Sequence, residues 1–318
     1  MEWLGNLFSQ GQGVLFESLL QPLLFQIGLG NLLPDAFNAT GWLLVGVVQL
    51  LVLLLMIGPL ERWRPVQAVT DRSLVRTDVL YTLIHRLGLF RLALFFTLDP
   101  LFDQGLGALR VAGWQTFQLD AIWPGVTDLP WGSWLLYLVV LDFVNYWIHR
   151  GEHQWNWWWQ LHALHHAQTQ MTMWTDNRNH LLDDVIRAVI FVVVAQLIGI
   201  APGQFVALVA FTQLSESFQH ANVRLWFGAW GERLWISPRF HRLHHSVGIG
   251  HESHGRQTLG GHNFGVLLPW WDMLFGTANF ELRFDATGVR DQVEQGRDYG
   301  RGFWAQQRLG LLRLFGRA

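Results

Sequence analysis

Long apolar runs, separated by short charged segments, are the main pattern along this chain. The clearest run is residues 41–60, GWLLVGVVQLLVLLLMIGPL, which contains no charge and has about the length that a ~30 Å hydrocarbon core requires. Residues 131–148 form another apolar run, which ends just before His149. Residues 13–33 are apolar but contain Glu17, so we expect them either to span the membrane or to lie in its interface.

Two further apolar stretches contain features that a simple span lacks. Residues 78–98 include His85 and two Arg, and in a span such side chains must face protein or reach the interface. Residues 185–214 are interrupted by Gly-Ile-Ala-Pro-Gly at 199–203. Glycine and proline there predict a tight turn between two short helices, a hairpin that returns to the side from which it entered. The whole pattern predicts an all-α, multi-span transmembrane helical bundle.

The distribution of arginine predicts the orientation of this bundle. Four Arg lie between residues 61 and 76, directly after the strongest span, whereas residues 31–40 before it contain no basic residue. The positive-inside bias therefore predicts that the Arg-rich segment is cytoplasmic. Together with the hairpin, this orientation places residues 149–180 and everything from 216 onward in one compartment. We expect a multi-pass protein of a bacterial-type inner membrane, with the active site on the cytoplasmic side.

The composition agrees with a membrane protein and narrows its chemistry. Hydrophobic residues make up 51% of the 318 residues and charged residues only 14%, against roughly 25% charged in soluble domains. The mean hydropathy is +0.20. A net charge of −2 provides no basic field, which argues against a nucleic-acid partner. The chain has no cysteine, so any metal must be held by nitrogen or oxygen.

Three compact groups hold eight of the 14 histidines. They follow HxxxH once and HxxHH twice: His149 and His153; His162, His165 and His166; His241, His244 and His245. Spacings of three and four residues put side chains on one face of a helix. Burying eight imidazoles without partners would cost roughly 1 to 3 kcal/mol each, so we predict a metal site. One zinc takes at most four protein ligands, and eight nitrogens therefore suggest two metals. Spacing alone leaves Fe, Cu, Ni and Zn open.

Other residues are further candidates. His220 is expected to be a ninth ligand, and Glu216, one helix turn before it, is either a ligand or an acceptor that orients an imidazole. His180 is either a ligand or a structural residue. Three more histidines lie in a Gly-rich stretch after the last group: His251, His254 and His262. We expect most of these three not to bind metal, and the HESH sequence there is one residue short of the zincin motif HExxH.

The order HxxxH, HxxHH, HxxHH after several spans resembles the fatty acid hydroxylase and sterol desaturase superfamily of membrane di-iron oxygenases, over residues 135–280. Three further segments are similar to motifs of that family: FQHAN at 218–222, HNFG at 262–265 and WDMLFGT at 271–277. The chain departs from the family at His180-Leu-Leu-Asp183, where His-Pro-x-Glu is common. It also has Glu216 and His220 where some members carry a histidine pair.

The resemblance implies an O₂-dependent oxidoreductase with two Fe ions in a cytoplasmic, histidine-rich helical cap. The implied substrate is a lipid or sterol-like molecule from the lipid bilayer, which is hydroxylated or desaturated. The sequence has no GxGxxG or haem-attachment motif, so a separate electron donor is expected, such as a ferredoxin, a cytochrome or a reductase.

The expected organisation is a membrane-spanning region at 1–134, a catalytic region integrated with it at 135–280, and a cytoplasmic tail at 281–318. Two alternatives stay open: a membrane metal-binding or transport protein, and a zinc-dependent membrane hydrolase. Transporters usually place polar ligands at mid-bilayer, whereas these histidines lie at the ends of spans and between them. Metal content and activity would separate the three.

The 19 tryptophans predict a large contact with the membrane interface. The run Trp155, Trp157, Trp158 and Trp159 is expected to anchor the cap on lipid headgroups. The same role is expected for Trp226, Trp230, Trp235, Trp270 and Trp271. Residues 303–315 predict a basic amphipathic helix on the inner leaflet, peripheral to catalysis.

Overall fold

A computed structural model describes residues 2–247 and 261–318 of the protein. These residues form helices joined by loops and contain no strand, although Ser246 and Thr287 pair in an isolated antiparallel bridge. The all-α class is therefore confirmed. The chain divides into two compact units, Met1–Val52 with Leu83–Trp114, and Leu53–Thr82 with Gln115–Ala318.

The first unit contains the N-terminal helices and the helices that follow residue 83. Its elements are α1 (Glu2–Leu15), η1 (Phe16–Leu20), α2 (Gln21–Gln26), η2 (Gly30–Leu32), α3 (Leu33–Val52), the end of α5 (Arg72–Arg86), α6 (Leu89–Thr97) and α7 (Asp99–Val111). The backbones of α3 and α5 are so close that a Cβ on Gly46 would clash with the carbonyl oxygen of Arg86. The buried Arg86 side chain donates a 3.2 Å hydrogen bond to Gln49. This arginine faces protein, as expected for one inside an apolar stretch.

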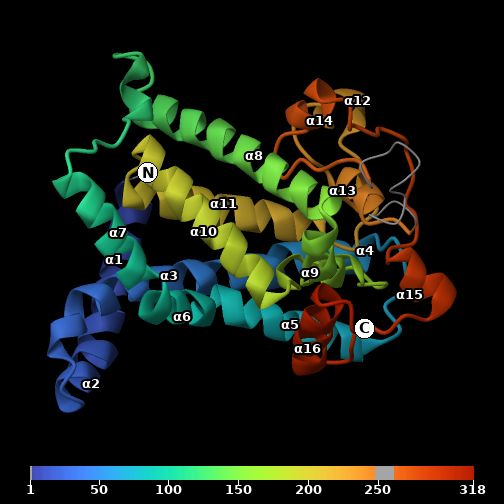
Figure 1. The fold of residues 1–318 in the computed structure, drawn as a ribbon, viewed down its shortest axis with the longest axis horizontal. Coiled ribbons are helices and arrows are strands. Elements are labelled where there is room, and N and C mark those ends of the chain that lie inside the picture. The colour runs from blue at the N-terminus through green and yellow to red at the C-terminus, as the bar shows by residue number, and fades with distance from the viewer. Residues whose placement is uncertain (1, 248–260) are drawn as a thin grey trace. The chain divides into compact units, whose positions relative to one another are not determined.

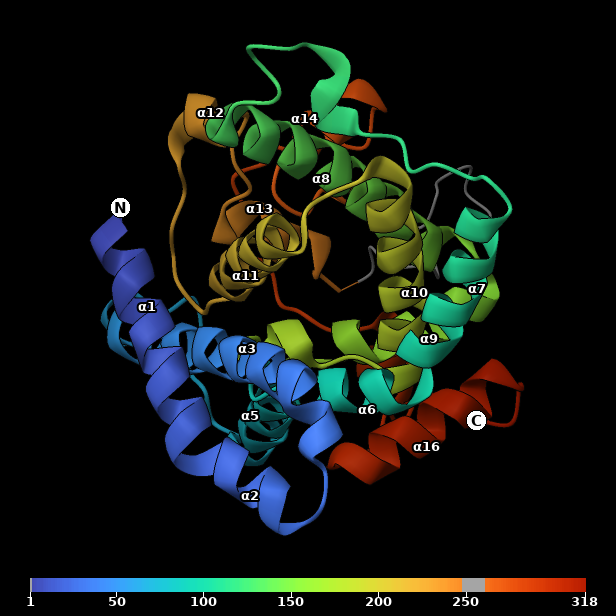
Figure 2. The same ribbon diagram turned by 90° about the vertical axis from the view of Figure 1, so that its left-hand side faces the viewer.

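The second unit contains the remaining elements and all three histidine groups. Its longer helices are α8 (Pro130–Gln154), α9 (Asn156–His166), α10 (Leu181–Ile198), α11 (Pro202–Gln219) and α16 (Phe303–Leu314). Its shorter elements are η3 (Leu53–Ile57), α4 (Gly58–Trp63), most of α5, η4 (Leu119–Ile122), η5 (Thr175–Asn177), α12 (Gly228–Gly231), α13 (Pro238–His244), α14 (Trp270–Leu274) and α15 (Arg290–Gln295). Helices α8, α10 and α11 run side by side, and α9 and α13 lie at one end of them (Figure 1, Figure 2).

Among the described residues, two helical stretches are long and apolar enough to cross a membrane. They are Gly30–Trp63, with 34 residues, and Pro130–Gln154, with 25 residues. Helices α5 and α6 are separated by a bend at Gly88 and make a third if the pair is one span. The expected spans thus have structural counterparts, except for residues 13–33, which contribute no helix of this length and apolarity.

The apolar block at 185–214 folds as a helical hairpin with longer helices than expected. Helix α10 ends where Gly199 adopts a φ of 75°, a left-handed conformation that glycine takes without strain. Pro202 begins α11, where its missing N–H is not needed. Each helix has 18 residues, because both continue beyond the apolar block into polar residues. Those polar ends place His180 and His220 at the same end of the second unit as the histidine groups.

The C-terminal helix packs against protein along its polar face. The side chains of Gln306, Gln307 and Arg313 on α16 are buried, and the helix contacts α9. Gln307 Nε2 donates to the Tyr81 hydroxyl at 2.9 Å, and its Oε1 accepts from the Leu181 N–H at 2.8 Å. The expectation of a helix lying on the inner leaflet is corrected for this face, because its polar groups contact protein rather than lipid headgroups.

Candidate metal centre

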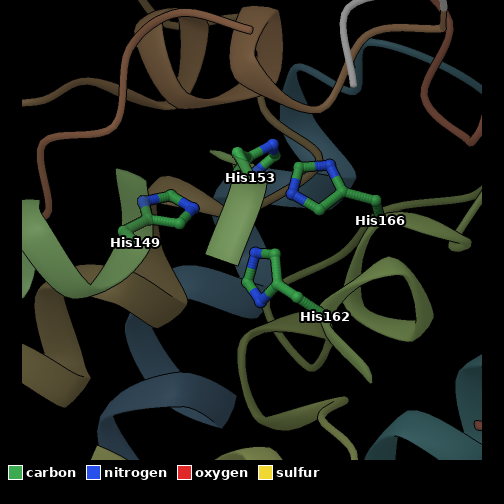
Figure 3. Close-up of side chains that lie close together, drawn as sticks. All are labelled: His149, His153, His162 and His166. Carbon is green, nitrogen blue, oxygen red and sulfur yellow. The ribbon is translucent and has the colours of Figure 1, made fainter. Parts of the chain in front are cut away.

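The end of α8 and the helix after it provide a first cluster of imidazoles. His149 and His153 lie one turn apart on α8, and His162 and His166 lie one turn apart on α9. Trp155 has an extended conformation between the two helices, and α9 packs against α8. One ring nitrogen from each histidine lies within 4.8 Å of the other three. Figure 3 shows the four rings around a common space.

A second cluster is assembled from three separate segments. His165 comes from α9, His220 from the end of α11, and His241 and His245 from α13 and its C-cap. The Nε2 atom of His220 lies 3.1 Å from that of His165 and 2.9 Å from that of His241. The His241 Nε2 atom is in turn 3.1 Å from that of His245. The four Nε2 atoms therefore converge on one point.

The remaining predicted ligand, His244, lies between the two clusters. It forms a third group with His166 and His245, whose rings stack with their centroids 4.2 Å apart. The structure thus brings together all nine histidines that the sequence singles out as ligands, and all nine are buried. Two adjacent four-nitrogen groups match the expectation of two metals rather than one.

Backbone carbonyls orient three of these rings. The Nδ1–H of His149 donates to the Phe264 oxygen at 2.8 Å, and that of His244 donates to the His262 oxygen at 2.7 Å. The Nδ1–H of His220 donates to the Glu216 oxygen, one helix turn earlier, at 2.7 Å. A neutral imidazole that donates through Nδ1 carries its lone pair on Nε2. These contacts therefore leave Nε2 as the nitrogen that each ring offers to a metal.

Charged side chains buried next to His162 perform the same role for that ring. The His162 Nδ1 lies 3.3 Å from Asp183 Oδ2 and 3.4 Å from Glu152 Oε2. Arg187 donates to Glu152 Oε1 at 2.9 Å, and Trp158 Nε1 donates to Asp183 Oδ1 at 2.6 Å. Burial raises the pKa of Asp183 to about 7, against the opposing effect of Arg187.

Glu152 is not among the residues that the sequence points to, although it lies inside the first histidine motif, HRGEH. The sequence singles out Asp183 only because it stands where His-Pro-x-Glu is common in the family. For Glu152 the available signal was an acid within a group of candidate ligand histidines, since ligand imidazoles usually donate their outer N–H to a carboxylate or a carbonyl. Asp183 lies 17 positions after His166 and carried no such local signal.

The clusters fit metal ions better than they fit protein hydrogen bonds. Burial lowers the pKa of His162 to about 4 and that of His244 to about 3, so the rings are neutral and can coordinate. The Nε2 atoms of His162, His166 and His244 are buried and have no hydrogen-bond partner, which costs roughly 1 to 3 kcal/mol for each atom. Metal–nitrogen bonds of about 2.1 Å would hold tetrahedral ligands about 3.4 Å apart, near the separations in the second cluster.

The remaining candidates lie outside the clusters. His180 uses both ring nitrogens: Nδ1 accepts from the Leu182 N–H at 3.1 Å, and Nε2–H donates to the Gln307 oxygen at 2.9 Å. It caps α10 and has no lone pair left for a metal. Glu216 orients His220 through its backbone oxygen, and the His262 backbone oxygen orients His244 in the same way. His251 and His254 lie outside the described residues.

The tryptophan run after the first motif has two roles instead of one. Trp155 and Trp157 are exposed, in agreement with an interfacial belt, but Trp158 and Trp159 are buried. The Trp159 ring packs 5.0 Å from that of His153. The belt prediction is corrected for these two residues, because the turn between α8 and α9 directs them into the protein, where Trp158 donates to Asp183 and Trp159 packs on His153. Of the later tryptophans, Trp226, Trp230 and Trp270 are exposed, while Trp235 and Trp271 are half-buried.

The HNFG and WDMLFGT segments form the frame that holds the Phe264 carbonyl. The buried Asp272 carboxylate accepts from the N–H groups of Phe264 and Gly265 at 2.8 and 2.7 Å, and from the Thr277 hydroxyl at 2.6 Å. A Cβ on Gly265 would lie 2.8 Å from the Asp272 carboxylate, so glycine allows this close approach. Asn263 has a φ of 59° and donates through Nδ2 to the Phe240 oxygen at 3.0 Å. These motif residues position the Phe264 carbonyl that accepts from His149.

Residues 134–277 match the fatty acid hydroxylase family. This segment is therefore similar to the fatty acid hydroxylase domain. The match spans every histidine of both clusters, so the fatty acid hydroxylase domain and the candidate metal centre coincide.

Individual relatives of the chain are named as a hydroxylase, a monooxygenase and a desaturase. It is 26% identical to the ornithine lipid hydroxylase OlsE of Rhizobium tropici, over 88% of this chain and 81% of that protein. It is 29% identical to the alkylglycerol monooxygenase of Homo sapiens, over 48% of this chain and 33% of that protein. It is 30% identical to the Delta(7)-sterol 5(6)-desaturase ERG3B of Gibberella zeae, over 49% of this chain and 46% of that protein. The chain thus spans less than half the length of the last two. No solved structure is significantly similar to it.

Proposed function

We propose that this protein is an integral-membrane, O₂-dependent di-iron oxidoreductase that hydroxylates a lipid-like substrate. The observation that carries the proposal is the convergence of nine buried histidines into adjacent clusters at the end of a helix long enough to cross a membrane. A lipid can reach such a site from the bilayer. The relatives support this substrate class, since they are named for ornithine lipid, alkylglycerol and sterol. Desaturation is the second outcome, supported by the sterol desaturase.

The proposed ligands of the two iron ions are the members of the two clusters together with His244. The first cluster comprises His149, His153, His162 and His166, and the second His165, His220, His241 and His245. Imidazole nitrogen suits iron. When bound, the two ions supply the reduction of O₂ and the oxidising power that an unactivated C–H bond requires.

The chain's own residues position the ligands and keep water out. Carbonyl oxygens and the Asp183 and Glu152 carboxylates hold the outer nitrogens, which fixes the ring orientations. The Phe264 ring lies 5.2 Å from that of His153, on which Trp159 also packs. Such aromatic walls exclude water from the reacting carbon and so favour reaction with the substrate over loss of the oxidant to solvent.

We propose that the metal centre faces the cytoplasm and receives electrons from a separate protein. The basic segment that follows the Gly30–Trp63 stretch supports this orientation. A ferredoxin, a cytochrome or a reductase is the expected donor, because the sequence holds no GxGxxG or haem-attachment motif.

Metal analysis of protein purified without oxygen tests the centre directly. Two iron ions per chain are expected, and one zinc ion with hydrolytic activity would overturn the proposal. His165→Ala should lower the iron content and abolish activity, because His165 Nε2 points into the second cluster. His85→Ala is the matched control, since His85 lies in the first unit and outside both clusters; it should keep both ions.

The reaction itself is tested by incubating membranes with an electron donor system under ¹⁸O₂. Hydroxylation places the label in the lipid product, whereas desaturation yields a new double bond without label. Products with neither change would refute the proposed function. Comparing the lipids of cells with and without the gene would then identify the natural substrate.

A further inference from the structure

A cavity of about 630 Å³ lies beside the metal centre, within the ~300 to 1,000 Å³ range of ligand pockets. The lining side chains that matter are Arg150, His262, Phe275, Thr277, Phe280 and Glu281. Two of them belong to the frame of the centre as well: Arg150 directly follows His149, and the His262 carbonyl accepts from His244. A molecule bound in this cavity therefore lies next to the candidate metal-coordinating histidines.

Arg150 has hydrogen-bonding capacity that the protein does not use. Its NH1 donates to the Tyr146 hydroxyl at 2.9 Å, and its guanidinium lies 5.3 Å from the Trp147 ring centroid. Its Nε is buried without a hydrogen-bond partner, and no carboxylate of residues 2–247 or 261–318 lies within ion-pair distance of it. A partly buried guanidinium in this state is suited to a carboxylate or phosphate, whose oxygens match its planar donors.

Glu281 supplies the opposite charge to the same cavity. One of its carboxylate oxygens lies 3.1 Å from Arg283 NH1, and both side chains are exposed. Exposed ion pairs of this kind contribute little, so the Glu281 carboxylate remains available to an ammonium group. A cavity with a cation on one wall and an anion on another matches a ligand that carries both charges.

The cavity is continuous with apolar side chains at the end of the membrane helix. The Phe275 ring lies 5.0 Å from that of Trp147 and 5.4 Å from that of Tyr146 on α8. Trp147 on α8 and Met273 and Leu274 on α14 are exposed, and Figure 2 shows α14 beside α8. An apolar rim next to a charged cavity suits a lipid whose chains stay in the bilayer while its headgroup enters the cavity.

We infer that this cavity binds the zwitterionic headgroup of the substrate lipid, with its acidic oxygen on Arg150 and its ammonium on Glu281. The inference rests on the proposed function, because it takes the bound lipid to be the substrate. A phosphate or a carboxylate can supply the acidic oxygen. Sterols and free fatty acids do not carry the paired charges and would leave Arg150 or Glu281 without a partner.

Native mass spectrometry of the full chain in a neutral sugar detergent tests this preference. Four probes with the same oleoyl chains are compared: phosphatidylethanolamine, an ornithine lipid, phosphatidylglycerol and diacylglycerol. At least one of the two zwitterionic lipids should bind about tenfold more tightly than both of the others, the ratio expected for one charge-assisted contact. The zwitterionic lipid with the higher affinity shows whether Arg150 binds a phosphate or a carboxylate. Equal affinity for all four lipids would overturn the inference.

Variants assign the preference to the two charges. Arg150→Gln should weaken zwitterion binding about tenfold and leave diacylglycerol unchanged, while Arg150→Lys retains part of the preference. Glu281→Gln should bind phosphatidylglycerol as well as phosphatidylethanolamine. Arg308→Gln, which removes an exposed charge on α16, is the control and should behave as wild type. A loss of diacylglycerol binding equal to the loss of zwitterion binding in Arg150→Gln would contradict the assignment.

Metal content and ¹⁸O incorporation, measured on the same preparations, separate this inference from the proposed function. A di-iron protein that oxygenates uncharged and zwitterionic lipids equally well would refute the headgroup site and leave the oxygenase intact. A protein that binds zwitterionic lipids selectively but holds no iron and oxygenates nothing would refute the oxygenase instead.

Discussion

Asp272→Asn tests the link between the frame of the domain and its metal centre. Asp272 accepts from the Phe264 and Gly265 N–H groups and from the Thr277 hydroxyl. Asparagine keeps one acceptor oxygen, but its NH₂ group would face a buried N–H. The Phe264 N–H and the Thr277 hydroxyl share Oδ1, so the Gly265 N–H on Oδ2 is the donor that loses its partner.

The unsatisfied N–H costs roughly 1 to 3 kcal/mol, offset in part because asparagine removes a carboxylate whose pKa burial raises to about 6. A net loss of about 2 kcal/mol corresponds to a fall in Tm of about 3 °C for a chain of this length. The shifted Phe264 carbonyl also orients His149 less well, so metal affinity should fall about 10- to 100-fold.

The assay for Asp272→Asn is thermal unfolding in detergent at pH 7.5, combined with competition for iron against a chelator. Asp285→Asn is the matched control, because Asp285 is partly exposed and pairs with the exposed Arg283 at 2.7 Å; its effect should stay within about 0.5 kcal/mol. An unchanged Tm and an unchanged iron affinity for Asp272→Asn would refute the reasoning that this carboxylate supports the centre.

Three further predictions follow from single contacts. His220→Ala should lower the metal content from two ions to one, because the Nε2 of His220 contacts two other ligands of the second cluster; two retained ions would contradict this. The Tm of metal-free protein should fall as the pH drops from about 6.5 towards 4. The reason is that His162 and His244 have pKa values of about 4 and 3 in the folded state, so in this pH range they bind protons only in the unfolded chain. His244→Gln should show a shallower fall of Tm with pH. Gly310→Ala would place a Cβ against the ring of His180 and should lower the free energy of unfolding by about 1 to 3 kcal/mol. The measurement is Tm, with Leu311→Ala at a neighbouring exposed position as the control. Equal falls in Tm for the two variants would argue against the packing of α16 on His180.

Local properties of the chain were enough to predict the class of fold and to select the nine histidines as candidate metal ligands. The apolar run at 41–60 and the HxxxH and HxxHH spacings each depend on residues within one or two helical turns, and helical geometry alone puts those side chains on one face. His180 and the buried Trp158 and Trp159 escaped this reasoning, because their roles depend on partners elsewhere. His180 is held by Gln307, 127 positions away, and Trp158 by Asp183, 25 positions away.

The division of eight of these histidines into two clusters of four was decided only by the tertiary structure. His162, His165 and His166 share one motif, yet His165 joins His220 and His241, while His162 and His166 join His149 and His153. Neighbours on one helix point in directions about 100° apart, so a single HxxHH motif can serve two sites once α8, α11 and α13 surround it. The carbonyls that orient His149 and His244 come from Phe264 and His262, 115 and 18 positions away. Spacing along the chain predicted which histidines converge, but only the packing of these helices determined which of them lie in the same cluster.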